Sequence, residues 1–186
     1  MRSLVFKITI AVLFVVGAAS LASMGVRAQD PGESLRFSSR LSSFNEVPPK
    51  AIGSHGTFNA TLSDDGTTLN WTLTWTGLTG PPSAAHIHFA QAGVSSGVMT
   101  WLCGGPAGNS DIMPKPACPQ NPSGSITGTT TAADIVQSNA TSTTDLGVDL
   151  HDFAAFLRAL RAGDGYANMH TARFGGGEIR GQLAVQ

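Results

Sequence analysis

The residues best suited to chemistry are the two histidines in the segment from Ala84 to Phe89. Side chains alternate between faces along an extended strand, so His86 and His88 share one surface while Ala85 and Ile87 share the other. Neutral imidazole nitrogens bind copper and zinc. The spacing therefore predicts a pair of metal ligands on a strand whose other face packs in a core. The alternative is two ordinary surface or hydrogen-bonding histidines, because a His-x-His pair alone is an unspecific motif.

A third imidazole lies downstream in the segment from Tyr166 to Thr171, where alternation places Tyr166, Asn168 and His170 on one face. If this strand neighbours the histidine pair, His170 completes a three-imidazole site for copper or zinc with one coordination position open. Each imidazole must lose its proton to coordinate, so the affinity should weaken as the pH falls through about 6.5. His55 is a candidate extra ligand, although its glycine-rich surroundings equally favour a plain turn.

Two charged residues follow His170 after a short glycine-rich turn, and alternation puts Glu178 and Arg180 on the face expected for His170. In that position Glu178 would orient one imidazole by accepting its N–H, and Arg180 would hold an anion beside the open coordination position. The alternative is a surface ion pair of little energetic weight. His151 lies between Asp149 and Asp152 and is expected to be solvated surface instead of a ligand.

The chain has two cysteines, Cys103 and Cys118. In an exported chain an isolated pair predicts a disulfide, here closing a segment rich in glycine and proline. By the chain-entropy estimate such a bridge contributes about 3 kcal/mol. Metal ligation by the two thiolates is the alternative, which the lack of Cys-x-x-Cys spacing disfavours.

The distribution of apolar residues predicts an all-β fold. Residues 56–62 and 69–76 each alternate apolar and polar side chains around the turn Asp64-Asp65-Gly66, which is typical of a β-hairpin whose Trp71 and Trp75 face inward. Further short strands are expected over residues 35–44, 84–89, 98–102, 124–130, 166–171 and 178–183. Strands at these intervals favour an antiparallel β-sandwich or a partly open, Greek-key-like barrel.

One inserted amphipathic helix is expected near residues 149–162. Apolar residues recur there at the spacing of a helix face, in the stripe Leu150, Phe153, Leu157 and Leu160. Asp149 is the expected N-cap, and Arg158, Arg161 and Gly163 suit the C-terminal end.

Residues 1–28 have the features of a secretory signal peptide. Arg2 and Lys7 precede an apolar run over residues 8–19, and Val26-Arg27-Ala28 offers a cleavage site before Gln29. A retained membrane anchor is the alternative, but the uninterrupted run is shorter than the roughly 20 residues that span a bilayer. We therefore expect a secreted or periplasmic protein in which residues 29–186 form one domain, with its core at about 35–185.

The charge balance of the chain limits the kinds of partner that it can bind. The chain has a formal net charge of −1, and loss of the three basic residues of the export segment lowers it to −4. No basic stripe is present, so nucleic acid is excluded as a partner. An extracellular protein or a glycan is the remaining expectation. Asn59, Asn70 and Asn139 begin Asn-x-Thr sequences, which are glycosylation acceptors only in a eukaryotic source.

Four separated motifs together resemble one family. They are Asn45–Pro49, Ala85–His88, Tyr166–Thr171 and Gly176–Leu183. In this order and spacing they resemble the CHRD domain, a module named after its repeats in chordin and also found singly in exported bacterial proteins. The resemblance covers about residues 35–185 and implies an all-β, sandwich-like domain with an inserted helix. It implies a binding module and no defined activity.

A weaker similarity is to copper-zinc superoxide dismutases, which also place a His-x-His pair on the outer face of a β-sandwich strand. This chain lacks an obvious bridging histidine and a run of zinc ligands. Two function classes therefore follow: an exported non-enzymatic binding module that holds copper or zinc, or a metal-dependent redox enzyme with a superoxide-dismutase-like copper site. Hydrolysis is a weaker third class, because no serine or cysteine nucleophile is visibly paired with His170.

Overall fold

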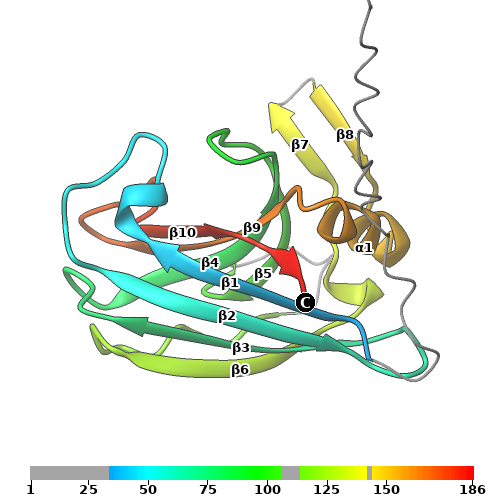
Figure 1. Ribbon diagram of the computed structural model, residues 1–186, viewed down its shortest axis with the longest axis horizontal. Coiled ribbons are helices and arrows are strands. Elements are labelled where there is room, and N and C mark those ends of the chain that lie inside the picture. Colours follow the sequence, from blue (N-terminus) through cyan, green and yellow to red (C-terminus); the bar gives the residue numbers. More distant parts are fainter. Residues whose placement is uncertain (1–33, 106–113, 142–143) are drawn as a thin grey trace, which may run out of the picture. The chain divides into compact units, whose positions relative to one another are not determined.

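One curled antiparallel sheet dominates the computed structural model, which describes residues 34–105, 114–141 and 144–186. The strand order is β5-β4-β9-β10-β1-β2-β3-β6, with β11 also paired to β1. The sheet bends into a nearly closed barrel, with helix α1 beside it (Figure 1). Its strands are β1 (Arg36–Ser42), β2 (His55–Leu62), β3 (Leu69–Thr76), β4 (Pro82–Phe89), β5 (Val98–Cys103), β6 (Gly124–Thr130), β9 (Gly165–Thr171), β10 (Ile179–Gln182) and β11 (Ala184–Val185). The expected all-β fold is confirmed.

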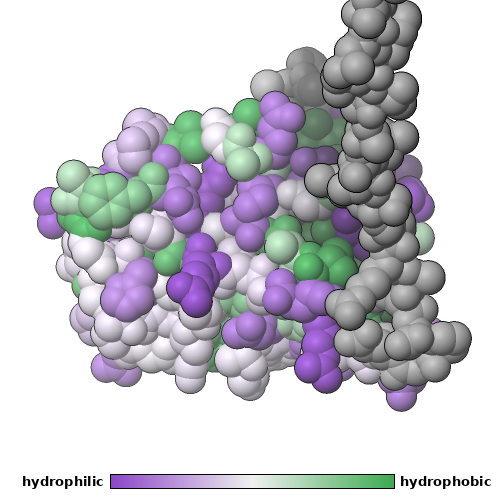
Figure 2. Space-filling view, in the orientation of Figure 1, coloured by the Kyte–Doolittle hydropathy of each residue, from purple (hydrophilic) through white to green (hydrophobic). Residues whose placement is uncertain are grey.

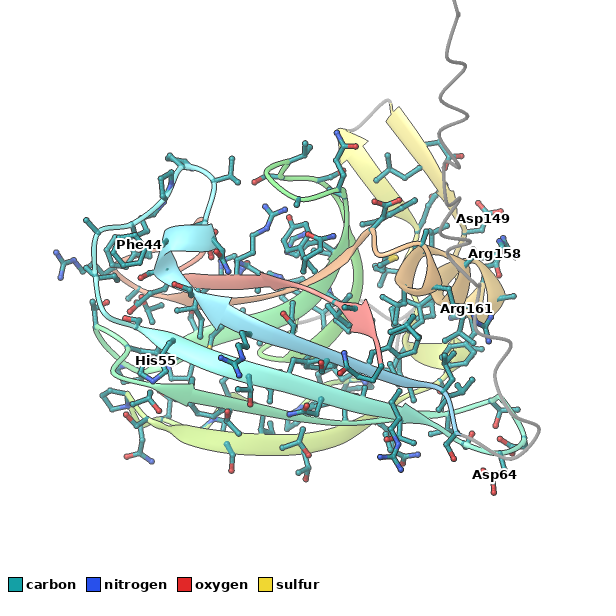
Figure 3. The ribbon with its side chains drawn as sticks, in the orientation of Figure 1. Phe44, His55, Asp64, Asp149, Arg158 and Arg161 are labelled. Carbon is teal, nitrogen blue, oxygen red and sulfur yellow. A yellow bond between two sulfur atoms is a disulfide. The ribbon has the colours of Figure 1, made fainter. Side chains whose placement is uncertain are left out.

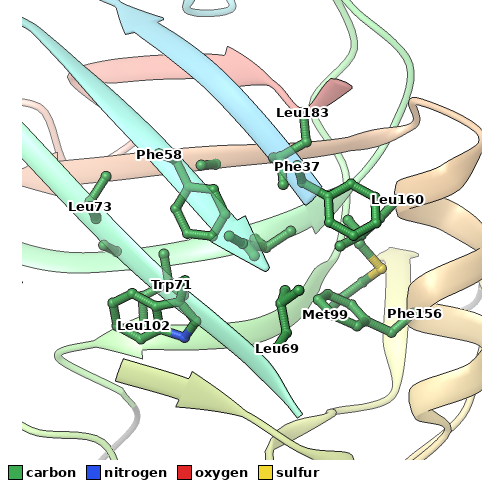
Figure 4. Close-up of a cluster of buried hydrophobic side chains, with 14 of the residues drawn as sticks. Phe37, Phe58, Leu69, Trp71, Leu73, Met99, Leu102, Phe156, Leu160 and Leu183 are labelled. Atoms are coloured by element: carbon green, nitrogen blue, oxygen red, sulfur yellow. The ribbon is translucent and has the colours of Figure 1, made fainter. Parts of the chain in front are cut away.

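The predicted hairpin is β2 and β3, which pair in continuous antiparallel register from His55–Thr76 to Leu62–Leu69. Trp71 and Trp75 are buried, as their alternation predicts. The apolar faces of the strands fill the barrel interior, which Figure 4 shows as a cluster of aromatic and aliphatic side chains. This core fixes which face of each strand points outward, and so positions the polar residues described below.

Outside the main sheet lie β7 (Ser138–Thr141), β8 (Thr144–Val148), the 3-10 turns η1 (Ser43–Asn45) and η2 (Ala132–Asp134), and helix α1 (Phe153–Arg161). The expected start of the helix at Asp149 is wrong. Asp152 is the N-cap and its side chain accepts the amide N–H of Ala155 at 2.7 Å. The preceding His151 has a positive φ of 64°. Leu150 therefore falls outside the helix and is 44% exposed instead of joining the buried stripe.

Cys103 and Cys118 form a disulfide, as expected, with their Cα atoms 5.0 Å apart. The signal peptide expected at residues 1–28 and part of the bridged segment, residues 106–113, lie outside the described residues. Among the helices of the described part, none has the length and apolar character needed to cross a bilayer.

The face shown in Figure 2 is mostly polar, and its apolar residues form small separate spots. The exposed large apolar side chains of the described residues are scattered over several loops and strands: Phe44, Val47, Val94, Leu150 and Val185. Single exposed apolar side chains of this kind are ordinary on folded proteins.

Candidate metal centre

Strand pairing brings the three candidate ligands together. β4 and β9 are antiparallel neighbours, and their register places Ala84 opposite His170 and His86 opposite Asn168. His86, His88 and His170 therefore project from one face of two adjacent strands, as alternation predicts. One ring nitrogen from each lies within 4.8 Å of the others.

The imidazole rings pack against one another. The centroid of His86 lies 4.8 Å from that of His88 and 4.5 Å from that of His170. His86 is central and only 5% exposed, and the edge of Trp101 covers it at a centroid distance of 4.3 Å. Two nitrogens bound to one ion at about 2.0–2.1 Å in tetrahedral geometry lie about 3.4 Å apart. Ring rotations that bring the widest pair of nitrogens about 1.4 Å closer would therefore allow a shared ion.

Backbone carbonyls fix the tautomers of two of the rings. Nδ1 of His88 lies 2.8 Å from the carbonyl oxygen of Ser96, and Nδ1 of His170 lies 2.9 Å from that of Gly175. A carbonyl oxygen can only accept, so both Nδ1 atoms carry the proton and both Nε2 atoms present a lone pair. The Nε2 atom of His170 is buried and has no hydrogen-bond partner among the described residues. A buried nitrogen lone pair without a partner fits a metal ligand.

The third ring completes the arrangement. Nδ1 of His86 lies 2.9 Å from Nε2 of His88, and because that Nε2 is unprotonated, Nδ1 of His86 is the donor. A metal ion would take the His88 lone pair that this hydrogen bond now uses. Hydrogen bonds therefore satisfy the nitrogens of the three rings only in part, and the remaining lone pair on Nε2 of His170 is available to a cation.

All three histidines are neutral near pH 7. Burial lowers the pKa of His86 to about 2, with smaller contributions from His170 and His88. Burial also lowers the pKa of His88 to about 4, against the opposing hydrogen bond to Ser96, and it lowers the pKa of His170. This burial moves the pH at which metal affinity is predicted to weaken to below the roughly 6.5 expected for free imidazoles. Protons compete for these nitrogens only at lower pH, because burial disfavours the imidazolium form.

Arg180 lies beside the cluster but is engaged elsewhere. Its guanidinium carbon lies 3.4 Å from the ring centroid of Tyr166. Its N–H groups donate to the carbonyl oxygens of Gln91 and Val94 and to Oγ of Ser95. The side chain therefore fastens the loop that follows β4 to the outer face of β10.

Glu178 does not orient an imidazole. Its carboxylate accepts four hydrogen bonds, two from the amide and hydroxyl of Thr79 and one each from the hydroxyls of Ser54 and Thr171. The donors come from three separate segments, so this carboxylate joins loops together. Backbone carbonyls, and not Glu178, accept the Nδ1–H groups of His88 and His170.

His55 stands apart from the group. Its ring is exposed on β2, and its Nδ1 contacts the carbonyl oxygen of Gly53 at 3.0 Å (Figure 3). The alternative of a plain turn at this residue is not what the structure shows, because His55 is the first residue of β2 and pairs with Thr76.

The sequence analysis places Asn168 on the face of His170 and Glu46 in a family motif, but it gives neither residue a role in the site. Glu46 is 4% exposed, and its Oε1 accepts a hydrogen bond from Nδ2 of Asn168 at 2.6 Å. Burial raises the pKa of Glu46 to about 7, although the positive charges of Arg180 and Lys50 oppose this shift. The only sequence signal for Glu46 is its position in the proline-rich segment Asn45–Pro49, because prolines hold the backbone of such a segment rigidly.

Comparison with known proteins gives one clear finding. The CHRD domain model matches residues 37–183, nearly the whole of the described sheet. Neither the curated proteins nor the solved structures contain a match. The matched range includes Glu46, the three histidines, Asn168, Glu178 and Arg180, and it agrees with the observed antiparallel fold. The chain belongs to the CHRD domain family.

Proposed function

We propose that this protein is an exported, non-enzymatic binding module of the CHRD type that holds one copper or zinc ion through His86, His88 and His170. The observation that carries the proposal is the Nε2 atom of His170, buried without a partner beside two further imidazoles. An unsatisfied buried nitrogen costs free energy in the folded protein. A bound cation would recover that cost.

The donor set indicates which ions are suited. Three neutral imidazoles favour copper and zinc over magnesium or calcium, which prefer oxygen ligands. Both cysteines are in the disulfide, so no thiolate competes for the ion within the described residues. Carbonyl oxygens behind His88 and His170 supply the outer hydrogen bonds that orient histidine ligands in metal sites.

The wider role is binding outside the cytoplasm. The disulfide supports an oxidising compartment. Three protein ligands leave a coordination position at which a side chain of an extracellular protein, or a glycan hydroxyl, would join the ion.

Calorimetric titration of the chelator-treated protein with Zn²⁺ tests this proposal. Wild type should bind one ion, and a triple His86→Ala, His88→Ala, His170→Ala variant should bind at least roughly a hundredfold more weakly. The matched control is a double His55→Ala, His151→Ala variant, which also loses imidazoles but should bind like wild type. Equal affinity of wild type and the folded triple variant would overturn the proposal.

A further inference from the structure

A buried carboxyl group lies on the same face as the histidines without belonging to the ligand group. Glu46 follows η1 and its Oε1 lies 2.6 Å from Nδ2 of Asn168. Gly177 borders this carboxyl so closely that a Cβ there would lie 2.6 Å from Oε1. The lack of a side chain at position 177 therefore leaves room for the Glu46 carboxyl group, which a larger residue there would displace.

Asn168 connects this carboxyl to the candidate metal centre. It lies opposite His86 on β4 and opposite Arg180 on β10. It is also two residues before His170 on the same face of β9. Glu46 is therefore connected to the imidazole cluster through one side chain, that of Asn168, and it is not a member of the three-histidine group.

The charges around Glu46 show what this carboxyl can do. Arg180 of β10 and Lys50 of the same loop are the positive groups that act on it, and the phenol of Tyr166 on β9 is the further titratable group near it. The imidazoles of β4 and β9 are neutral, so they do not compensate a positive charge at the centre. A dication at this centre would add two positive charges beside Arg180. Glu178, the other buried carboxyl on this face, has its oxygens occupied by four hydrogen bonds, so Glu46 is the carboxyl that responds to the added charge.

We infer that Glu46 is the charge-compensating residue of the metal centre: it favours divalent over monovalent ions and releases its proton when a dication binds. This inference rests on the proposed function. Near neutral pH the imidazoles have no proton to lose, so a proton released by the protein comes from the buried carboxyl. Ion binding raises the local positive charge and so favours the carboxylate form.

The first test compares Zn²⁺ with Ag⁺, a monovalent ion that imidazoles also bind, in chloride-free nitrate buffer at pH 7.5. Glu46→Gln keeps the oxygen that accepts from Asn168 but removes the charge. It should weaken Zn²⁺ binding roughly tenfold and Ag⁺ binding only about threefold, because the charge contribution to the binding free energy halves for a monovalent ion. Asp64→Asn is the matched control, since Asp64 is an exposed carboxyl in the β2–β3 turn (Figure 3). It should change neither affinity.

The second test needs only wild type and covers the case in which the variant misfolds. Zn²⁺ titrations at pH 6.5 in two buffers of different ionisation enthalpy give the number of protons released. Wild type should release about one more proton with Zn²⁺ than with Ag⁺. Glu46→Gln should lose this excess proton, whereas a proton lost from a metal-bound water would still be released by the variant. Equal proton release for the two ions, or an unchanged Zn²⁺ affinity in Glu46→Gln, overturns the inference while leaving the three-histidine site intact. Loss of histidine-dependent Zn²⁺ binding in wild type overturns both.

Discussion

The ring of Tyr166 lies parallel to that of His88, with 4.6 Å between the centroids and 3° between the planes. Because β4 and β10 flank β9 on opposite sides, Tyr166 is held between His88 and the guanidinium of Arg180. This packing keeps the His88 ring in the plane from which its Nδ1 meets the Ser96 carbonyl.

Replacing Tyr166 tests that stack. Tyr166→Leu should cost about 2 kcal/mol of unfolding free energy through the lost ring stacking and cation–π contact, and it should weaken Zn²⁺ binding. Tyr166→Phe loses only the hydroxyl that accepts from the amide of Ser96 at 3.3 Å, so it should cost about 1 kcal/mol or less. Denaturant melts and Zn²⁺ titrations measure both effects. Equal losses in the two variants would show that the hydroxyl, and not the ring, matters.

Gly177 is predicted to tolerate no side chain. Its φ is +117°, and an added Cβ would lie 2.6 Å from both Glu46 and Asn168. Gly177→Ala should lower the unfolding free energy by about 2 kcal/mol or more, through backbone strain and displacement of the buried carboxyl. Gly176→Ala is the control, because nothing lies within 4 Å of the position that an added Cβ would take there. Similar denaturation midpoints for the two variants would contradict the described packing.

Glu178 is predicted to be a stabilising residue and not part of the metal centre. Glu178→Ala leaves the hydroxyls of Ser54 and Thr171 and the donors of Thr79 without their acceptor. The unfolding free energy should fall by about 3 kcal/mol or more. Circular dichroism during a denaturant titration measures this. Asp64→Asn, which removes an exposed carboxylate, should be neutral; a neutral Glu178→Ala would contradict the role.

The buried histidines give the metal-free protein a pH-dependent stability. The unfolded chain protonates its histidines near 6.5, whereas burial lowers the folded-state pKa of His88 to about 4 and that of His86 to about 2. The unfolded state therefore binds more protons, and stability is lost as the pH falls from about 6.5 towards 4. Glu46 acts in the opposite sense, because its folded-state pKa is raised from 4.5 to about 7 and its contribution is lost as the pH rises through that range.

Glu46→Gln removes the contribution of Glu46 to the pH dependence of the unfolding free energy and leaves the contribution of the histidines. Between pH 4.5 and 6.5 its unfolding free energy should rise more steeply with pH than that of wild type. Thermal melts at half-unit steps, in the presence of a chelator, compare the two slopes. Identical slopes would mean that Glu46 titrates normally in the folded protein.

The alternation of side chains was sufficient to predict the sheet and the histidine face. The runs around Trp71 and Trp75 specify which face is buried, because a shift of one residue would turn every apolar side chain to solvent. The same rule places His86, His88 and His170 on the outer face. The pairing of β4 with β9, which alternation alone does not specify, then brings His170 to the pair.

The contacts of the polar residues could not be predicted in this way. Glu46 and Asn168 are 122 positions apart in sequence, and no local pattern indicates that a loop glutamate is buried against a distant strand. Alternation also assigns Glu178 to the histidine face, but hydroxyl groups from other segments surround it. The helix start was missed because Asp149 and Asp152 are equally good caps by residue type, and the positive φ of His151 is a tertiary effect.

X-ray absorption spectroscopy of the Zn²⁺-loaded protein tests the central claim most directly. A single ion held by His86, His88 and His170 should show three imidazole nitrogens at about 2.0–2.1 Å, with the outer-shell scattering typical of imidazole rings. The triple alanine variant, loaded in the same way, should lose that pattern. A wild-type shell made only of oxygen atoms, or a spectrum that the three substitutions leave unchanged, would contradict the account.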